Sequence, residues 1–345
     1  MITVGQVTTY DEGVAWDRYV QNHPSACGYQ LIGWRRIAEQ ALGHLTLYLM
    51  ARDRSEQIRG VLPMVFVSSP LFGRQLVSMP AVNYGGVLSD RADAQRALLN
   101  AAVDHAKHLG ATQVELRHQA PMDLDWKARQ HKVSMRLDLP REFETLWKRF
   151  PSKLRSQVRR AQKEHLTVRI ETTEILDDFY RVFARNMRDL GTPVYGLRFF
   201  ETILEVFPKD VRICVVYRNR EPVAAGFLYG YLNTLEIPWA SADRRYNHLA
   251  PNMLLYSSVL EYACREGFEV FDFGRSSPNT GPYRFKEQWG ARPVPLYWYH
   301  WSADGRPVRE VSKENSRYHL AIKIWQRLPI ALTRVVGPLI VRNIP

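Results

Sequence analysis

Hydrophobic positions in the second half of the chain follow first a helical period and then a strand period. Between positions 251 and 266 they recur every three or four residues, which predicts an amphipathic helix. Pro251 and Asn252 open this helix, with Asn252 as a candidate N-cap, and Gly267 ends it. Residues 269–273 then alternate between polar and apolar, which is typical of a strand.

A polar loop and an aromatic segment follow that strand. Residues 274–282 are rich in Gly, Ser, Pro and Asn, and residues 285–290 (FKEQWG) predict a short cationic helix. Residues 296–301 predict an aromatic strand. Because loops at the carboxyl ends of sheet strands commonly build functional sites, we expect the site of this protein here.

The same order of elements is predicted twice along the chain. Strands and helices alternate through residues 1–139, beginning with a strand, two helices and two strands. Residues 166–300 predict a strand, two helices, three strands, a helix, a strand, a short helix and a strand. The 345 residues suffice for two ordinary domains. We therefore predict an α/β (α+β) protein with domains at 1–139 and 140–300, each with a mixed central sheet, and a tail at 301–345.

The composition is that of a soluble globular protein with a strong positive charge. Hydrophobic residues make up 46% of the chain and charged residues 24%. The formal net charge is +12. Such a charge favours an anionic partner, which can be a nucleic acid, a phosphorylated or lipid-linked substrate, or an acidic membrane face. A basic surface kept for solubility is the alternative.

Cysteine usage and the termini indicate a cytoplasmic protein. Cys27, Cys214 and Cys264 are widely separated, and an odd count without a C-x-x-C pair argues against a disulfide framework. The N-terminal residues show no basic segment followed by an apolar run, so no signal peptide is expected. No apolar stretch reaches the length of a transmembrane helix without a charge.

A basic segment lies between the two predicted domains. Residues 148–163 contain seven Lys or Arg and no Asp or Glu. Arg155, Arg159 and Lys163 are spaced four apart and form a basic stripe, separate from an apolar stripe of the same helix. Because like charges at this spacing repel, the helix either stays fully solvated or faces an anion such as phosphate.

Several classes of enzyme lack support in the sequence. There is no G-x-S-x-G, no Walker loop and no H-E-x-x-H. His105 and His108 lie three apart without an evident third ligand, so we predict surface histidines and no metal. A transferase with few dedicated groups remains. Acyl transfer to an amine needs a proton acceptor, a group that stabilises the carbonyl oxygen, alignment of two substrates and exclusion of water.

Lys286 is the first candidate for that chemistry. Its cation lies beside Phe285 and Trp289 and can hold a phosphate or face a developing oxyanion, unless it is an exposed helix lysine. Asp272 and Arg275 flank the end of the predicted strand. Asp272 can position Arg275 or accept a proton, or the two can form a structural ion pair.

Glu236 is the candidate base, and other residues are candidates for the substrate pocket. Glu236 lies in the predicted strand 234–242, where Pro238 and Trp239 can raise its pKa by desolvation but Pro238 leaves the register uncertain. Asn83 and Tyr84 are either part of a simple turn or a wall of a pocket between the halves. The remaining pocket candidates are Tyr283, Tyr195, Arg188 and Asn252.

The motifs FDFGRS and Gly281…Phe285-Lys286…Trp289-Gly290 resemble those of the FemAB-like proteins. The family pattern is G-x-x-x-FK-x-x-FG, and this chain has Trp where others have Phe. The resemblance extends from about position 147 to the C-terminus and, more weakly, through the first half. Within this family, the chain is similar to the branch associated with exosortase (PEP-CTERM) and exopolysaccharide gene clusters.

The resemblance implies a fold, an activity and roles for residues. It implies two tandem GNAT acyltransferase domains and relatedness to peptidoglycan-bridge aminoacyltransferases, which act on cell-envelope precursors. It implies that Phe285 and Lys286 lie near the reactive end of the donor, that Glu236 lies where many GNAT enzymes have a base, and that Arg155 and Arg159 lie near a negatively charged substrate.

The donor stays undecided between acyl-CoA and aminoacyl-tRNA. The segment 247–251 lacks the glycines of the usual GNAT pyrophosphate loop. This departure puts acyl-CoA in doubt and is consistent with aminoacyl-tRNA. The expected acceptor is an anionic small molecule or a lipid-linked precursor.

The tail predicts short amphipathic helices. Apolar residues recur every four positions, and no acidic residue follows Glu314. The pattern is typical of a helix on the inner face of the cytoplasmic membrane, although the tail can instead pack on the domains. Pro329 and Pro338 are expected to break it into pieces. The apolar residues are Leu320, Ile324, Leu328 and Leu332, and the cations are Arg317, Lys323, Arg327, Arg334 and Arg342.

We therefore predict an N-acyl- or aminoacyltransferase acting on a cell-envelope or exopolysaccharide precursor. The alternative is a non-catalytic protein with a degenerate GNAT fold, which binds nucleic acid through Arg155 and Arg159 or serves as a scaffold. The lack of a known RNA motif and the few aromatic residues near the basic segment count against nucleic-acid binding.

Overall fold

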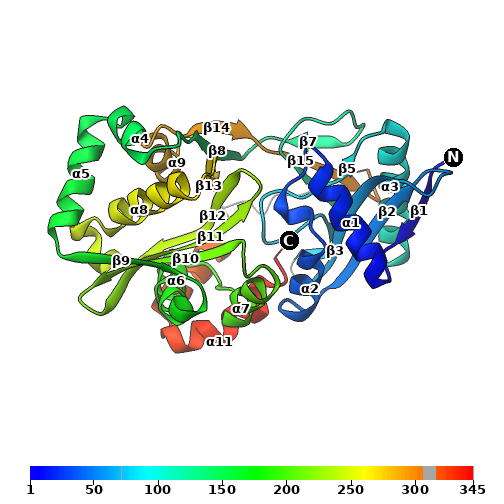
Figure 1. Cartoon of the computed structure of the whole chain (residues 1–345). Coiled ribbons are helices and arrows are strands. Elements are labelled where there is room, and N and C mark those ends of the chain that lie inside the picture. The colour runs from blue at the N-terminus through cyan, green and yellow to red at the C-terminus, as the bar shows by residue number, and fades with distance from the viewer. Residues whose placement is uncertain (71, 306–315, 345) are drawn as a thin grey trace. The chain divides into compact units, whose positions relative to one another are not determined.

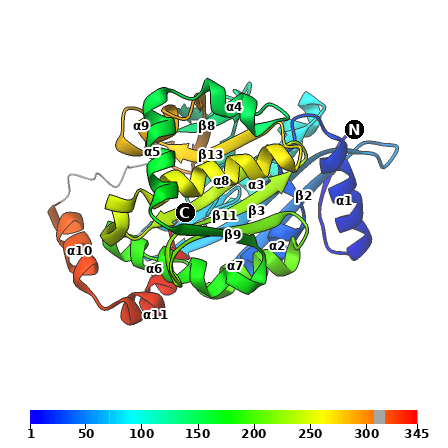
Figure 2. The same ribbon diagram turned by 60° about the vertical axis from the view of Figure 1, so that its left-hand side comes forward.

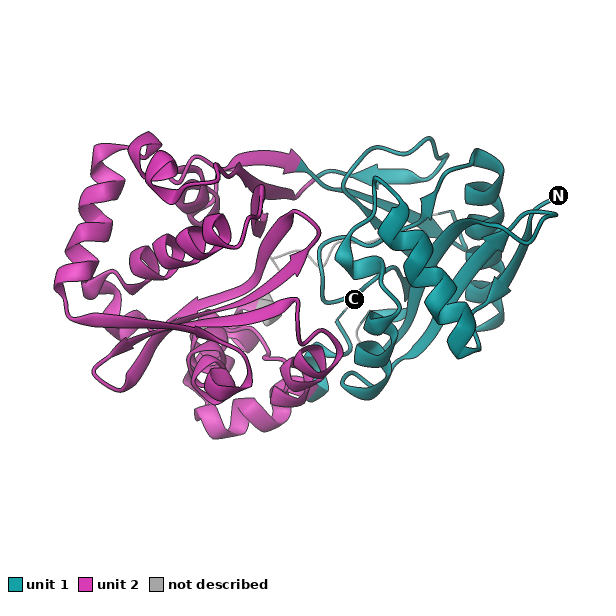
Figure 3. Ribbon diagram, viewed as in Figure 1, with its two compact units in different colours: residues 1–130, 295–311, 339–345 teal, residues 131–294, 312–338 magenta. Residues whose placement is uncertain are grey.

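The computed structural model describes residues 1–70, 72–305 and 316–344, which form two compact units (Figure 1, Figure 3). The described residues of unit 1 are 1–70, 72–130, 295–305 and 339–344. Those of unit 2 are 131–294 and 316–338. Each unit is built around its own mixed sheet, which confirms the predicted α/β class.

Unit 1 contains an eight-stranded sheet in the order β1-β2-β3-β4-β6-β15-β7, with β5 paired to β3. Its only parallel pair in the described chain is β4 with β6; the other pairs are antiparallel. The strands are β1 (Thr3–Gln6), β2 (Leu45–Arg52), β3 (Ile58–Ser69), β4 (Gly73–Val77), β5 (Leu88–Ser89), β6 (Gln113–His118), β7 (Lys127–Arg129) and β15 (Tyr297–Ser302). The helices are α1 (Tyr10–Asn22), α2 (Gly33–Gln40) and α3 (Ala92–His108).

Alternating side chains bury the two faces of this sheet under different helices. On β3, Leu62 and Met64 belong to the core that α3 covers, whereas Val65 and Val67 pack with Ala38 of α2. The period of two along the strand therefore buries both faces of this sheet.

Unit 2 contains a seven-stranded sheet in the order β14-β8-β13-β12-β11-β10-β9. The strands are β8 (Val133–Asp138), β9 (Leu166–Glu171), β10 (Val211–Arg218), β11 (Glu221–Tyr231), β12 (Thr234–Ala242), β13 (Val270–Ser276) and β14 (Arg292–Pro295). The helices are α4 (Phe143–Arg149), α5 (Ser152–Lys163), α6 (Leu176–Leu190), α7 (Leu197–Val206), α8 (Pro251–Arg265), α9 (Gly281–Glu287), α10 (Ser316–Arg327) and α11 (Ile330–Val341), the last of which continues into residues of unit 1.

Helices cover both faces of the unit 2 sheet (Figure 2). α8 connects the parallel strands β12 and β13 and packs with α4 and α5 on one face, while α6 and α7 cover the other. The core under α6 is aromatic: Phe200 lies 4.9 Å from Phe179, 5.2 Å from Phe227 and 5.3 Å from Trp239, as ring centroids. These contacts, edge-on with Phe179 and Trp239 and tilted with Phe227, hold β11 and β12 against α6 and α7.

The compact units differ from the predicted domains at two strands. β8 precedes the predicted boundary at 139/140, yet it pairs with β13 in the sheet of unit 2. β15 follows the second domain in sequence, yet it pairs with β6 and β7 in unit 1. Strand pairing between distant segments decides these boundaries, and the local hydrophobic pattern does not contain that information.

Helix ends and the tail differ from the predictions in detail. The residue before α8 is Ala250, in the left-handed conformation (φ 53°), so Ala250 and not Asn252 is the N-cap. Pro329 separates α10 from α11 as predicted, but Pro338 lies within α11 and does not end it.

Candidate active site

The candidate site of unit 2 lies where the parallel strands β12 and β13 separate. The pair runs in register only through Thr234–Val270, Leu235–Phe271 and Glu236–Asp272. Opposite β11 the register of β12 also shifts, so that Ile237 and Pro238 face one residue, Leu228. Proline has no N–H to donate, and the bulge lets β12 bend away from β13.

Asp272 ends the paired part of β13 and is completely buried. Its carboxylate accepts hydrogen bonds from the Ser134 hydroxyl, the Gly274 amide at 2.8 Å and Arg136 Nε at 3.1 Å. Three donors, one of them a guanidinium, thus satisfy the hydrogen-bonding capacity of this buried carboxylate. The ion-pair partner is thus Arg136 from β8, whereas Arg275, the partner considered from sequence, lies on the surface.

Lys286 reaches the end of the same strand from α9. Its side chain is 8% exposed, and its ammonium donates to the carbonyl oxygens of Gly274 at 2.9 Å and Arg275 at 3.0 Å. Burial lowers the pKa of Lys286 to about 8, while the carboxylates of Asp272 and Glu236 oppose this shift. An ammonium group has three N–H donors, and the third has no hydrogen-bond acceptor among the described residues.

The alternative of an exposed helix lysine is therefore wrong for Lys286. The ammonium is held by backbone carbonyls at the strand ends, and not by the aromatic rings that flank it in sequence. Gly274 has φ of +74°, a conformation that favours glycine and turns its carbonyl out of the sheet pairing. Lys286 thus binds carbonyl oxygens of β13 beyond the point where β12 pairs with it.

Glu236 lies opposite Asp272 in the strand register and is 3% exposed. Because its charge acts on Lys286, the two side chains are electrostatic neighbours. The structure therefore brings together three of the residues predicted for chemistry: Glu236, Asp272 and Lys286. Arg136 and Ser134, which hold Asp272, were missed, because nothing in the sequence links β8 to a strand 136 residues away.

An aromatic cluster fixes α9 against the core. Tyr256 of α8 lies 5.1 Å from Phe285, and Trp289 lies 5.4 Å from Phe150, as ring centroids. Trp289 is completely buried and Phe285 partly buried. Both rings thus position the helix that carries Lys286. Tyr283 packs on the edge of the same core.

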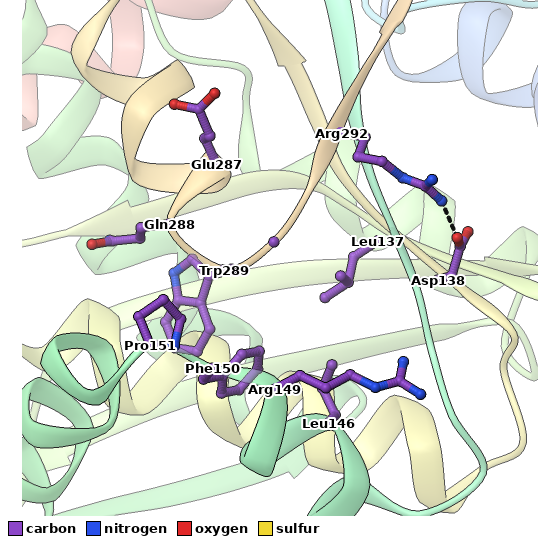
Figure 4. Close-up of a pocket in the computed structure, with 11 residues that line it drawn as sticks. Leu137, Asp138, Leu146, Arg149, Phe150, Pro151, Glu287, Gln288, Trp289 and Arg292 are labelled. Carbon is purple, nitrogen blue, oxygen red and sulfur yellow. Dashed lines mark hydrogen bonds and ion pairs between the residues drawn. The ribbon is translucent and has the colours of Figure 1, made fainter.

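A hollow of about 490 Å³ lies on the Trp289 side of α9 (Figure 4). Its apolar part includes Phe150 and Trp289, and Figure 4 shows Arg149 and Arg292 at its edge, with Arg292 paired to Asp138. Lys286 is not among its lining residues, so this hollow is separate from the divergence of β12 and β13. The full lining is Leu137, Asp138, Leu146, Arg149, Phe150, Pro151, Glu287, Gln288, Trp289, Gly290 and Arg292.

The other predicted residues of unit 2 lie outside this cluster. Arg188 pairs with Asp189 at 2.7 Å and donates to the Leu328 carbonyl at 3.3 Å. The Tyr195 ring stacks on Phe199 with centroids 4.6 Å apart. Asn252 is partly buried in the first turn of α8.

Asn83 and Tyr84 belong to unit 1. Tyr84 is buried against Tyr29 at 5.2 Å, and the Asn83 carbonyl accepts from Trp298 Nε1 at 3.3 Å. The contacts of both residues support the unit 1 core, which agrees with the simple-turn interpretation. Their predicted role in a pocket stays a prediction.

The basic segment, residues 148–163, forms the end of α4 and all of the amphipathic helix α5. Leu154, Val158 and Ala161 are buried, and the seven cations form no ion pair with a carboxylate in the described parts of the chain. The Arg159 guanidinium lies 5.8 Å from the Trp147 ring, and Arg155 is partly exposed. No carboxylate among the described residues offsets the repulsion, so the surface either stays solvated or meets an anion.

Residues 148–287 match the family model of the acetyltransferase (GNAT) domain. Unit 2 therefore contains a GNAT domain, and the protein is an acyltransferase. The GNAT domain expected from the sequence is thus confirmed. The matched residues run from α5 to α9 and include the whole β12–β13 site apart from the residues of β8. No curated protein sequence matches the chain.

Solved structures show that the fold continues through both units. FemX has a TM-score of 0.65 and 16% identity, covering 86% of this chain and 97% of its own. A tandem GNAT protein from the clavulanic acid biosynthesis pathway has a TM-score of 0.57 and 12% identity, covering 90% and 100%. The C-terminal domain of a putative lysylphosphatidylglycerol synthetase from Agrobacterium fabrum has a TM-score of 0.57 and 12% identity, covering 85% and 92%. The predicted tandem GNAT architecture is thereby confirmed.

Proposed function

We propose that unit 2 transfers an acyl or aminoacyl group to an amine of a cell-envelope or exopolysaccharide precursor. The observation that carries this proposal is the environment of Lys286: a buried ammonium with an available third N–H, where β12 and β13 separate. A charged donor held in a site of low polarity stabilises a developing oxyanion far better than one in water.

The proposed reaction assigns one task to each residue. The acceptor amine attacks the donor carbonyl carbon, and the third N–H of Lys286 stabilises the oxygen as it becomes negative. Glu236 takes the proton that the amine loses. The C–S bond of a thioester or the C–O bond of an aminoacyl ester then breaks, and the leaving sulfur or oxygen takes up a proton. Asp272, whose oxygens already accept three hydrogen bonds, acts as a positioning residue.

The donor is either acyl-CoA or aminoacyl-tRNA. Residues 244–249 form a short 3-10 helix without glycine, and Pro251 at the start of α8 has no N–H for a phosphate. These features disfavour the usual mode of CoA binding. The unpaired cations of α5, including Arg155 and Arg159, favour a polyanionic donor such as tRNA.

The acceptor is proposed from the fold neighbours and the family resemblance. FemX and a putative lysylphosphatidylglycerol synthetase share the fold, and the second is named for an aminoacylated lipid. These neighbours support a lipid-linked or otherwise anionic acceptor at the cytoplasmic side of the cell envelope. The exosortase-associated branch suggests an exopolysaccharide sugar as the acceptor class.

Mass spectrometry of the purified protein and a transfer assay test this proposal. We expect a co-purifying CoA thioester or charged tRNA, and transfer from that donor to an amine acceptor. Lys286→Met should reduce kcat by about 10³-fold, the effect of losing one oxyanion donor. Lys209→Met, which removes an exposed cation of unit 2 outside α5 and outside the β12–β13 site, is the matched control. Equal rates for Lys286→Met and the wild type, with the same melting temperature, would contradict the proposal.

A further inference from the structure

The two C-terminal helices α10 and α11 have an inner face that is fixed to unit 2. Ile322 packs so closely on Gly191 that a Cβ there would meet it at 2.5 Å. The Gln326 amide donates to the Asp189 carbonyl at 3.0 Å. The Leu328 carbonyl accepts from Arg188. α10 therefore lies along the end of α6 as an ordered part of the domain.

The inner face of α11 covers the loop between α6 and α7. A Cβ at Gly337 would meet the backbone of Val194 at 2.9 Å, and Pro338 lies against Gly196. Thr333 is 1% exposed, and the Arg334 guanidinium lies 5.0 Å from the Tyr180 ring. This close packing explains how α11 continues through Pro338, because the neighbouring loop supports the helix from one side.

The outer face of the same helices leaves large apolar side chains in water. Leu320 is 59% exposed and Ile324 54%, one turn apart on α10. Leu332 is 44% exposed and Val335 68%, three residues apart on α11. Single exposed apolar residues are ordinary, but four within 16 positions, two on each helix, indicate a surface that contacts something apolar.

The charges around these residues are of one sign. Residues 315–345 contain five Lys or Arg and no Asp or Glu. Lys323, Arg327 and Arg342 are exposed beside the apolar positions. An apolar stripe with cations alone is complementary to the interface of an anionic bilayer, where acyl chains accept the apolar groups and headgroups accept the cations.

We propose that the outer face of α10 and α11 docks on the surface of an anionic bilayer. Leu320, Ile324, Leu332 and Val335 insert below the headgroups, and Lys323 and Arg327 contact lipid phosphates. Among the described residues, no helix is long and apolar enough to cross a bilayer, and each of these two has 12 residues, which fits binding parallel to the surface. This surface is distinct from the β12–β13 site, so its test does not depend on the proposed reaction.

Sedimentation of the full-length protein with vesicles tests the apolar half of the proposal. We expect binding to vesicles of phosphatidylcholine with 30% phosphatidylglycerol and at least about tenfold weaker binding to phosphatidylcholine alone. Leu320→Gln with Ile324→Gln should weaken binding at least about tenfold. The matched control is Leu45→Gln with Leu232→Gln, two residues of similar exposure elsewhere, which should bind as the wild type does.

The role of the cations in the proposed membrane binding is tested by removing two of them, either from α10 or from α5. Lys323→Gln with Arg327→Gln should weaken binding about 30-fold, about fivefold for each cation near an anionic surface. Arg155→Gln with Arg159→Gln removes the same charge from α5 and should leave binding unchanged. Equal losses in both variants would show attraction by net charge alone and would overturn the proposal. A wild-type dimer that becomes monomeric in Leu320→Gln with Ile324→Gln would also overturn it, because the face would then join two copies.

Discussion

Each unit contains a place where two parallel strands separate, and different groups bond to the backbone there in the two units. In unit 1, β4 and β6 pair through Val77–Glu115, and backbone bonds continue beyond it. Ser78 N donates to the Glu115 carbonyl at 2.8 Å, and the amides of Gly85 and Gly86 donate to the Arg117 carbonyl at 3.1 and 2.9 Å. In unit 2, the corresponding carbonyls of Gly274 and Arg275 bind a lysine side chain.

The cation near the separating strands has a structural role in unit 1, where it is Arg117, and a proposed chemical role in unit 2, where it is Lys286. Arg117 in unit 1 is buried, with Nε 2.7 Å from Glu115, a bond to the Val82 carbonyl at 2.8 Å and its guanidinium 4.3 Å from the Trp298 ring. Every side of this cation meets protein. Lys286 in unit 2 has a lowered pKa and a third donor available. We infer that unit 1 is closed by its own loop at this position, whereas unit 2 is the unit that reacts.

Glu236→Gln and Glu115→Gln give the largest expected contrast between the units. Glu236→Gln removes the proposed base of unit 2 and should lower kcat by about 10²–10⁴-fold, with little change in the melting temperature. Glu115→Gln should leave kcat per folded molecule unchanged. A transfer assay with both variants checks this, and an equal loss from both would break the distinction between the units.

Arg117→Met should show the structural role of the unit 1 cation. Arg117→Met removes the guanidinium that is bonded to the buried Glu115 carboxylate, and the loss of one partner of this buried ion pair should lower the free energy of unfolding by about 3 kcal/mol. Denaturant titration measures this change. If the variant unfolds like the wild type but loses transfer activity, the assignment of Arg117 to structure is wrong.

Gly86→Ala tests how tightly the unit 1 loop that contains Gly85 and Gly86 packs against Arg117 and His118. A Cβ at Gly86 would lie 2.3 Å from His118 Nε2 and 2.9 Å from the Arg117 carbonyl. We expect a loss of about 2 kcal/mol in the free energy of unfolding from this overpacking. Gly281→Ala in unit 2, where nothing lies within 4 Å, should change it by less than about 0.5 kcal/mol. Similar small effects at both glycines would mean that the unit 1 loop can move aside.

Local pattern was enough to predict the elements around the site. The predicted helix ending before Gly267 is α8, and the three consecutive strands predicted within residues 166–300, the last of them at 234–242, are β10, β11 and β12. Alternation and helical spacing are local properties, so each of these elements can be read from its own residues.

The contacts that make the site could not be predicted in the same way. Arg136 was missed as the partner of Asp272, because the pairing of β8 with β13 joins segments far apart in sequence. The exchange of β15 into unit 1 has the same cause. Lys286 was identified from its motif, but its carbonyl partners depend on the turn at Gly274, which the sequence shows only as one glycine in a polar loop.

The pH dependence of kcat/KM tests the central claim, that protonated Lys286 stabilises the reacting carbonyl oxygen, most directly. The charged form predominates below its pKa of about 8, so activity that requires it should fall about tenfold for each pH unit above that value. Lys286→Arg keeps a cation that does not titrate in this range and should lose this decline while retaining part of the activity. A decline near pH 8 that is the same in the wild type and in Lys286→Arg would contradict the account.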